Sequence, residues 1–366
     1  MLSPEQSRAR QQRLLRVLHD RRADAVVIGA PHHVYYLTAH LAHPLQQSGM
    51  VLFADGRSVL WTANEPNTEA AADDVRGYSA NLLSTLRQDQ EMVVVGEVVR
   101  GLAERGAKSV LVDSSVVSAQ VGLAFDGRCA SVDADLWQLR RAKDADELAL
   151  MRKAVACCAA MYARAREIIE PGLPELAMYG QLHAAAVREA GEPLRPAYLG
   201  NDYACGVPGG PARGGRVARA GELYILDLGP AYRGYFSDNA RTLSVDRKPT
   251  DEQYRAWERV TRCLKIVEEM ARPGVRCRAI FEAVNAYLQT ARGYPMNHHL
   301  GHGVGLQPHE FPHLNPNWDD VLIEGEVFTA EPGEYGEALG GGTRLENQYL
   351  VTAGGVENLV GAELDL

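Results

Sequence analysis

A pair of aspartates within one expected β-hairpin constrains this chain more than any other feature of its sequence. The segment LYILDLGPAYRGYFSDNARTLSV has two apolar runs around a turn, and each run carries one aspartate, Asp227 or Asp238. A tight turn at Tyr232-Arg233 would place the two aspartates directly opposite each other. Facing carboxylates destabilise a sheet, and more so when buried, unless a cation lies between them. The alternatives are that one aspartate faces solvent or that the hairpin register differs.

A histidine-rich segment, MNHHLGHGVGLQPHEFPHLNP, follows this hairpin in the sequence. It holds five of the eleven histidines of the chain: His298, His299, His302, His309 and His313. Gly301, Gly303 and Gly305 around His302 allow the backbone to approach a neighbouring group closely. The alternative is a surface loop that is rich in histidine by chance.

Two glutamates lie on expected strands in the C-terminal third. Glu331 follows the apolar run VFTA, and Glu346 is expected within an alternating strand with Arg344 on the same face. Either glutamate alone is typical of a solvent-facing strand position. Together with the two aspartates and His302, they predict an oxygen-rich site for a pair of divalent ions such as Mn²⁺, Fe²⁺ or Co²⁺, with Zn²⁺ left open. Two such ions can share carboxylates and generate a bridging hydroxide for hydrolysis.

The length and the order of the expected elements predict an α/β protein of two domains. The 366 residues exceed the ~100–200 residues of one domain. Expected helices alternate with strand candidates such as ADAVVIG and HVYYLTA, until Asp144 and Glu147 form a capping box for a long helix. We therefore place the domains at 1–140 and 141–366. Further helices are expected through ELAMYGQLHAAAVREAG, after Thr250, and up to Gly293.

Charge and hydropathy argue against several classes of partner. The net charge of -9 and the pI near 5.7 disfavour binding to nucleic acid or to an anionic membrane. No apolar run approaches the ~20 residues of a membrane span, and the N-terminus lacks the apolar region of a signal peptide. The six cysteines are scattered without a CxxC pair, which favours reduced thiols. We expect a soluble cytoplasmic protein.

The motifs resemble those of the pita-bread metallopeptidase family, which includes aminopeptidase P, prolidase and other Xaa-Pro dipeptidases, methionine aminopeptidase and the metal-free relative creatinase. The resemblance covers nearly the whole chain and rests on DLG, YFSDNART, GHGVGL, AEPGEY and RLENQYLVT. It implies a creatinase-like N-terminal α/β domain followed by a pita-bread catalytic domain with a curved antiparallel sheet. HVYYLTAH resembles the N-x-x-Y-L-T-G stretch of that N-terminal domain, with Ala39 in place of the glycine. This domain indicates the prolidase and aminopeptidase P branch.

The resemblance also implies residue roles. The ligands of two divalent ions, Mn²⁺ first and Co²⁺, Zn²⁺ or Fe²⁺ as alternatives, would be Asp227, Asp238, His302, Glu331 and Glu346. His309 would stabilise the tetrahedral intermediate or position the scissile carbonyl, and His298 would line the substrate pocket. Glu331 would also shuttle protons, and Arg344 would orient Glu346 or the carboxylate network. Relatives with this N-terminal domain are commonly dimers, so a homodimer is expected by analogy.

The implied function is hydrolysis of small peptides at Xaa-Pro bonds, by an Xaa-Pro dipeptidase or an aminopeptidase P-like enzyme. Xaa-Pro enzymes of the family usually carry a histidine seventeen residues before the first metal aspartate, and Gly210 occupies that position here. Three arginines of the same loop (213, 216 and 219) are either solvated or available to a substrate carboxylate. One alternative is therefore a non-peptidase enzyme, like creatinase, ectoine hydrolase or dimethylsulfoniopropionate lyase, acting on a small metabolite. A silent binding module is the other alternative, against which the complete ligand set argues.

Overall fold

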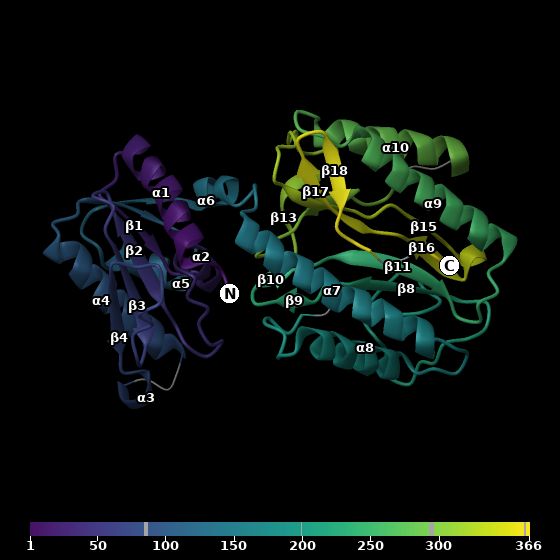
Figure 1. Cartoon of the computed structure of the whole chain (residues 1–366), viewed down its shortest axis with the longest axis horizontal. Helices are drawn as coiled ribbons and strands as arrows, with labels where there is room; N and C mark the ends of the chain where they lie inside the picture. The colour runs from purple at the N-terminus through teal and green to yellow at the C-terminus, as the bar shows by residue number, and fades with distance from the viewer. Residues whose placement is uncertain (84–86, 199, 293–295, 362–363) are drawn as a thin grey trace. The chain divides into compact units, whose positions relative to one another are not determined.

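The computed structural model describes residues 1–83, 87–198, 200–292, 296–361 and 364–366 (Figure 1). The chain divides into two compact units, Met1–Arg140 and Arg141–Leu366, called here the first and second units. The expected helix end at Gly293 lies outside the described residues. None of the helices in the described ranges is both long enough and apolar enough to cross a membrane.

The first unit is built on a six-stranded mixed sheet with the order β4-β3-β2-β1-β5-β6. Its strands are β1 (Ala25–Ile28), β2 (Gly49–Phe53), β3 (Ser58–Ala63), β4 (Asp74–Tyr78), β5 (Ser109–Val112) and β6 (Arg128–Ser131). Its helices are α1 (Pro4–Asp20), α2 (Pro31–Thr38), α3 (Ala80–Leu83), α4 (Arg87–Glu104), α5 (Val116–Ala124) and α6 (Asp133–Leu139). Apolar side chains of β1, β2, α4 and α5 form one buried core.

The HVYYLTA segment lies in helix α2 and not in a strand, so this expectation was wrong. Pro31 occupies the first turn of α2, where its missing N–H has no partner to lose. The helix ends at Ala39, whose φ of 59° is left-handed. Glycine adopts this left-handed conformation at a helix end most easily. The N-x-x-Y-L-T-G stretch of the creatinase-like N-terminal domain has a glycine at the position of Ala39. When every residue of an apolar run is buried, the run has no polar face, and its periodicity cannot show whether it forms a helix or a strand.

The second unit contains only antiparallel strand pairs among its described residues. The sheets are ordered β11-β8-β7, β13-β12-β14-β17-β18, β10-β9 and β15-β16. The first strands are β7 (Gly200–Asp202), β8 (Leu223–Leu228), β9 (Ala231–Tyr232), β10 (Tyr235–Phe236) and β11 (Asn239–Ser244). The later strands are β12 (Gly301–Gly303), β13 (Glu310–Leu314), β14 (Val327–Ala330), β15 (Gly333–Gly336), β16 (Gly341–Arg344), β17 (Asn347–Thr352) and β18 (Gly355–Asn358).

Two pairs of helices cover the strands of the second unit from opposite sides (Figure 1). One pair is α7 (Ala145–Ile168) and α8 (Glu175–Ala190), and the other is α9 (Asp251–Met270) and α10 (Cys277–Arg292). Each pair buries its own apolar core against the strands. The expected capping box of Asp144 with Glu147 is present at the start of α7. The helix expected after Thr250 is α9, and Thr250 forms a capping box there with Gln253.

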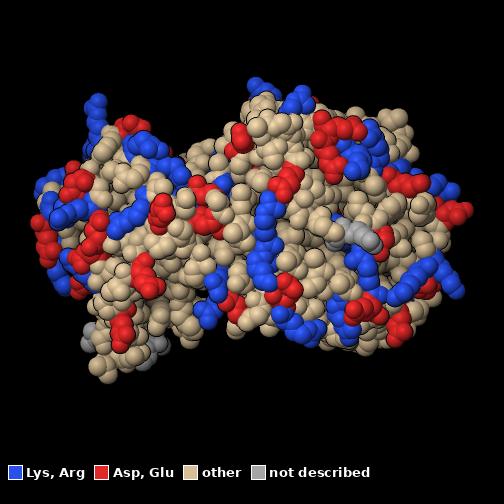
Figure 2. Space-filling model, viewed as in Figure 1, with Lys and Arg blue, Asp and Glu red and all other residues tan. Residues whose placement is uncertain are grey.

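Charged side chains of both signs are interspersed on the face of the molecule shown in Figure 2. Pairs such as Lys153 with Glu189, 2.7 Å apart, bring opposite charges together on the surface. Such exposed pairs contribute little to stability, because water and salt screen them. The acidic residues predicted to bind metal lie instead inside the second unit.

Candidate metal centre

The hairpin that carries both aspartates has a different register from the one expected. Its turn falls one residue later, at Arg233 and Gly234, whose φ angles of 47° and 88° fit a two-residue type I′ turn. Asp227 of β8 therefore pairs with Ala240 of β11, and Asp238 lies one residue before β11. The pairing shifts by two residues, which keeps both aspartates on the same face of the hairpin.

Three carboxylates converge on this face. The oxygens that Asp227, Asp238 and Glu346 could offer to a metal ion lie within 4.8 Å of one another, and all three residues are buried. Glu346 lies between β16 and β17 and not within a strand, which corrects the expectation. Its main chain is held from both sides: its N–H donates to the carbonyl of Ala240 at 2.9 Å, and its carbonyl accepts from Arg241 Nη1 at 2.6 Å.

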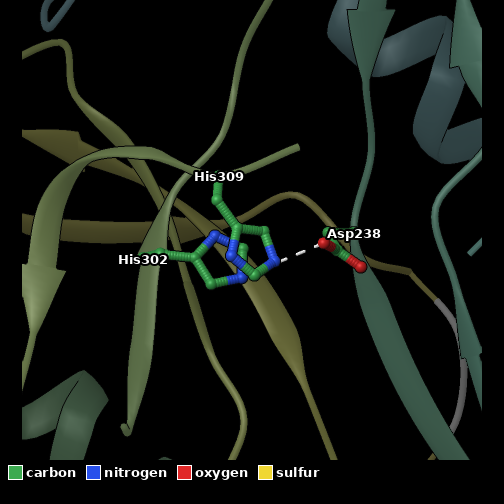
Figure 3. Close-up of side chains that lie close together, drawn as sticks. All are labelled: Asp238, His302 and His309. Carbon is green, nitrogen blue, oxygen red and sulfur yellow. Dashed lines mark ion pairs between the residues drawn. The ribbon is translucent and has the colours of Figure 1, made fainter. Parts of the chain in front are cut away.

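His302 extends the cluster from the neighbouring sheet. It lies in β12, with Nε2 at 3.6 Å from Glu331 Oε1 and 3.9 Å from Asp238 Oδ2. The His309 ring stacks on the His302 ring, with 3.7 Å between the ring centroids, and both rings point toward Asp238 (Figure 3). The structure therefore brings all five sequence-predicted ligand residues and His309 into one region.

The glycines around His302 are required by close strand packing. A β-carbon on Gly301 would lie 2.0 Å from the carbonyl oxygen of Thr329, and one on Gly303 would lie 1.7 Å from that of Phe311. Both distances are far below van der Waals contact. The sequence predicted a close approach of the backbone around His302 to a neighbouring group. That group is the main chain of β14 and β13, and the close packing fixes the position of His302.

His298 and Arg344 lie at the edge of this cluster. His298 Nε2 is 3.1 Å from the hydroxyl of Tyr335, which also lies 3.4 Å from Arg344 Nη1. Arg344 Nη2 donates to Asp227 Oδ2 at 2.9 Å. Burial and the neighbouring carboxylates raise the pKa of Glu346, and the charge of Arg344 partly opposes this rise. Arg344 therefore contacts the carboxylate network directly, through Asp227.

Two residues that contact the predicted site residues were missed by the sequence reasoning. His299 Nε2 donates to Glu331 Oε1 at 2.9 Å, and this hydrogen bond raises the pKa of His299. Its place in MNHHLGHG was a usable signal, although no role was assigned to it. Asp202 forms an ion pair with Arg344. Nothing in the sequence around Asp202 distinguishes it from an ordinary loop aspartate.

The buried acids have strongly shifted proton affinities. Burial and repulsion by neighbouring carboxylates raise the pKa of Asp227, Asp238 and Glu346 well above the ordinary values. Burial also acts to raise the pKa of Glu331, but the hydrogen bond from His299 opposes this effect, and the pKa of Glu331 lies below its usual range. Burial lowers the pKa of His302 to about 4, so its ring is neutral at pH 7, as a metal ligand must be.

The unpaired oxygens of this cluster fit a metal ion. Among the described residues, Asp227 Oδ1, Asp238 Oδ1 and both carboxylate oxygens of Glu346 are buried without a hydrogen-bond partner. Buried polar atoms without partners are rare, because leaving them unpaired is costly. Several carboxylate oxygens together with one neutral imidazole form the donor set that divalent ions such as Mn²⁺ and Fe²⁺ prefer. The cluster therefore has the donor atoms to bind divalent cations.

Two arginines of the glycine-rich loop (206–221) bind acidic residues of the chain itself. Arg213 donates from its backbone N–H and from Nε to the buried Glu175 Oε2, at 2.8 Å and 3.0 Å. Arg216 pairs with Glu222. Both contacts give these arginines a structural role, which neither of the two sequence interpretations foresaw.

Comparisons with known proteins agree with this arrangement. Residues 149–353, more than half of the chain, match the model of metallopeptidase family M24, and residues 10–141 match the creatinase/prolidase N-terminal domain. The Xaa-Pro dipeptidase of Pyrococcus horikoshii is 29% identical over 345 residues, which are 94% of each chain. The Xaa-Pro dipeptidase of Pyrococcus furiosus is 27% identical over 360 residues, covering 98% of this chain and 99% of the relative.

Solved structures show the same fold. The prolidase of Pyrococcus horikoshii OT3 matches with a TM-score of 0.79 at 25% identity, over 98% of this chain and 99% of that one. The X-Pro aminopeptidase of Thermotoga maritima matches with a TM-score of 0.79 at 21% identity, over 97% of this chain and 98% of that one. The expected fold class, a creatinase-like α/β domain followed by a pita-bread domain, is confirmed. With its buried carboxylate cluster and its match over 149–353, the chain belongs to metallopeptidase family M24.

Proposed function

We propose that the chain is an Xaa-Pro dipeptidase with two divalent metal ions. The family implies divalent metal ions, and the number and identity of the ions are part of this proposal, with Mn²⁺ first and Co²⁺, Zn²⁺ or Fe²⁺ as alternatives. The observation that carries it is the group of buried carboxylate oxygens that lack hydrogen-bond partners among the described residues. The proposed ligands are Asp227, Asp238, His302, Glu331 and Glu346.

The side chains around the proposed ions have distinct tasks. When bound, the ions supply water activation and polarisation of the scissile carbonyl. Glu331 is held ionised by His299, so its carboxylate can accept a proton from water and return it to the leaving amine. The His309 side chain is exposed, but the loss of hydration around its ring lowers its pKa, so the neutral ring has one N–H to donate to the developing oxyanion.

The substrate side of the proposal rests on His298 and on the activity of the relatives. The hydrogen bond between His298 and the Tyr335 hydroxyl holds the imidazole at the edge of the cluster, which supports its proposed place in the substrate pocket. The two Pyrococcus relatives are Xaa-Pro dipeptidases, and they match this chain nearly end to end. A dipeptide with proline after the scissile bond is therefore the first substrate to test.

Gly210 favours a second candidate function. Its φ of 121° lies in the left-handed region, where a side chain is strained even though the space around it is open. A histidine at this position would need a different backbone, so an imidazole is missing from this part of the loop. The second candidate is a non-peptidase pita-bread hydrolase that acts on a small metabolite.

The deciding experiment uses metal-stripped protein reloaded with Mn²⁺, and then with Co²⁺ or Zn²⁺. Amino-acid release is followed from matched Xaa-Pro dipeptides and Xaa-Pro-Yaa tripeptides. Turnover of the dipeptides alone is the expected result. Turnover of the tripeptides would make the enzyme aminopeptidase P-like, and no release with metal demonstrably bound would favour the second candidate, to be tested with small non-peptide amides.

We also propose a homodimer located in the cytoplasm. All six cysteines are free thiols, five of them buried, which fits a reducing compartment. The dimer rests on the family resemblance and is tested by light scattering of the purified protein. A mass equal to one chain across the working concentration range would refute it.

A further inference from the structure

We propose that Asp202 is a positioning residue that keeps the charge of Arg344 from neutralising the metal ligand Asp227. The proposal rests on the proposed function, because it concerns the same metal site. Asp202 is the last residue of β7 and the register partner of Asp227 in β8. The pairing places the two acids side by side at one edge of the cluster.

A single guanidinium nitrogen is shared between these two carboxylates. Arg344 Nη2 contacts Asp202 Oδ2 in an ion pair and lies 2.9 Å from Asp227 Oδ2. The three side chains are largely buried, with exposed fractions of 12% for Arg344, 12% for Asp202 and 7% for Asp227. Charges that are held this far from water interact strongly, so the balance of charge within this group matters.

The charge balance explains why a cation is tolerated beside a cation-binding site. If Arg344 had only Asp227 as its partner, it would compete with a metal ion for the charge of that ligand. The Asp202 carboxylate offsets the guanidinium charge, so Arg344 does not use up the negative charge that Asp227 can offer to a metal ion. The buried Oδ1 of Asp227 has no hydrogen-bond partner within the described ranges. Asp202 thereby strengthens metal binding without being a metal ligand.

The glycine-rich loop is shaped around the same carboxylate. The backbone N–H of Gly210 donates to Asp202 Oδ1 at 2.5 Å. A β-carbon on Gly209 would lie 2.7 Å from Asp202 Oδ2, and the φ angles of Gly209 and Gly210, 152° and 121°, disfavour any other residue. The loop therefore holds one carboxylate oxygen of Asp202 and leaves the other for Arg344.

The test is a double-mutant cycle on the affinity of the full-length, metal-stripped protein for Mn²⁺, measured by isothermal titration calorimetry. Asp202→Asn keeps an acceptor for Gly210 and removes the charge. We expect it to weaken Mn²⁺ binding about tenfold, whereas in an Arg344→Met background the same substitution should change the dissociation constant less than about threefold. Asp202→Ser, which is smaller and also keeps an acceptor, serves if the first variant does not fold.

Glu222→Gln is the matched control, since it breaks an ion pair of the same loop with Arg216, away from the cluster. It should leave Mn²⁺ affinity unchanged. The positioning role would be overturned if Asp202→Asn weakened Mn²⁺ binding equally in the wild-type and Arg344→Met proteins. It would also be overturned if Mn²⁺ affinity fell in neither protein. Wild-type protein that binds Mn²⁺ without cleaving Xaa-Pro peptides would refute the proposed substrate and leave this inference standing. A wild type that binds none of Mn²⁺, Co²⁺ and Zn²⁺ would refute both.

Discussion

Asp238 shows how one residue connects the chemistry of the site with the stability of the chain. Its carboxylate is buried beside Asp227, and repulsion between the two acids is relieved only by protonation or by a cation. Asp238→Asn should abolish hydrolysis and lower the metal content. It should also stabilise the metal-free protein by about 1–3 kcal/mol, because a neutral amide removes the cost of either ionising or protonating this buried acid at neutral pH.

Metal analysis, peptide hydrolysis and urea unfolding of the metal-free protein would check these three effects. His302→Ala is the companion variant: it should also remove activity and metal, but without the gain in stability. A fully active variant at either position would refute the assignment of both residues as ligands.

The raised pKa values of Asp227, Asp238 and Glu346 also predict how stability depends on pH. The folded metal-free protein binds these protons more tightly than the unfolded chain, so this contribution to stability is complete below about pH 4 and is lost as the pH rises through the raised values. Bound metal replaces the protons, and the increase in melting temperature on adding Mn²⁺ should therefore grow from pH 5 to pH 8. A constant increase across this range would contradict the prediction.

At the scale of single elements, the packing of β12 decides whether His302 is in place. Gly303→Ala would put a β-carbon 1.7 Å from the carbonyl oxygen of Phe311, so β12 and β13 must separate. We expect a loss of stability of about 3 kcal/mol or more, together with loss of metal binding. Chemical unfolding and metal titration measure both.

Gly180 provides the control for this substitution. It is an exposed position inside α8, where a β-carbon meets nothing within 4 Å. Gly180→Ala should stabilise the chain by about 0.5–1 kcal/mol through its helix propensity and leave metal binding unchanged. If both alanine variants behaved alike, close strand packing would not be what requires Gly303.

At the scale of the whole molecule, all proposed ligands come from the second unit. Metal binding should therefore increase protection from hydrogen exchange in β8, β11, β12, β14 and β17, because a ligand stabilises the folded state of the part that binds it. The strands β1 to β6 of the first unit should exchange at unchanged rates. Hydrogen-exchange mass spectrometry of the full chain, with and without Mn²⁺, checks this. Protection gained equally in both units would contradict it.

Local features of the sequence determined much of this protein. The capping residues at Asp144 and Thr250 were sufficient to place the starts of α7 and α9, since capping depends on residues within one turn. The acids and His302 stood out as a group because carboxylates and imidazole on apolar strands are costly without a partner. The short motifs around them were specific enough to indicate the family.

Other features were decided only by the tertiary structure. The hairpin register depended on which two residues could adopt positive φ at the turn, and a buried apolar run such as HVYYLTA forms a helix or a strand according to what surrounds it. The contact between Asp202 and Arg344 joins residues 142 positions apart in the numbering, and no local pattern encodes such a pair. Metal sites are assembled from distant segments, so the sequence could predict the donor atoms, whereas the charges that balance them follow from the fold.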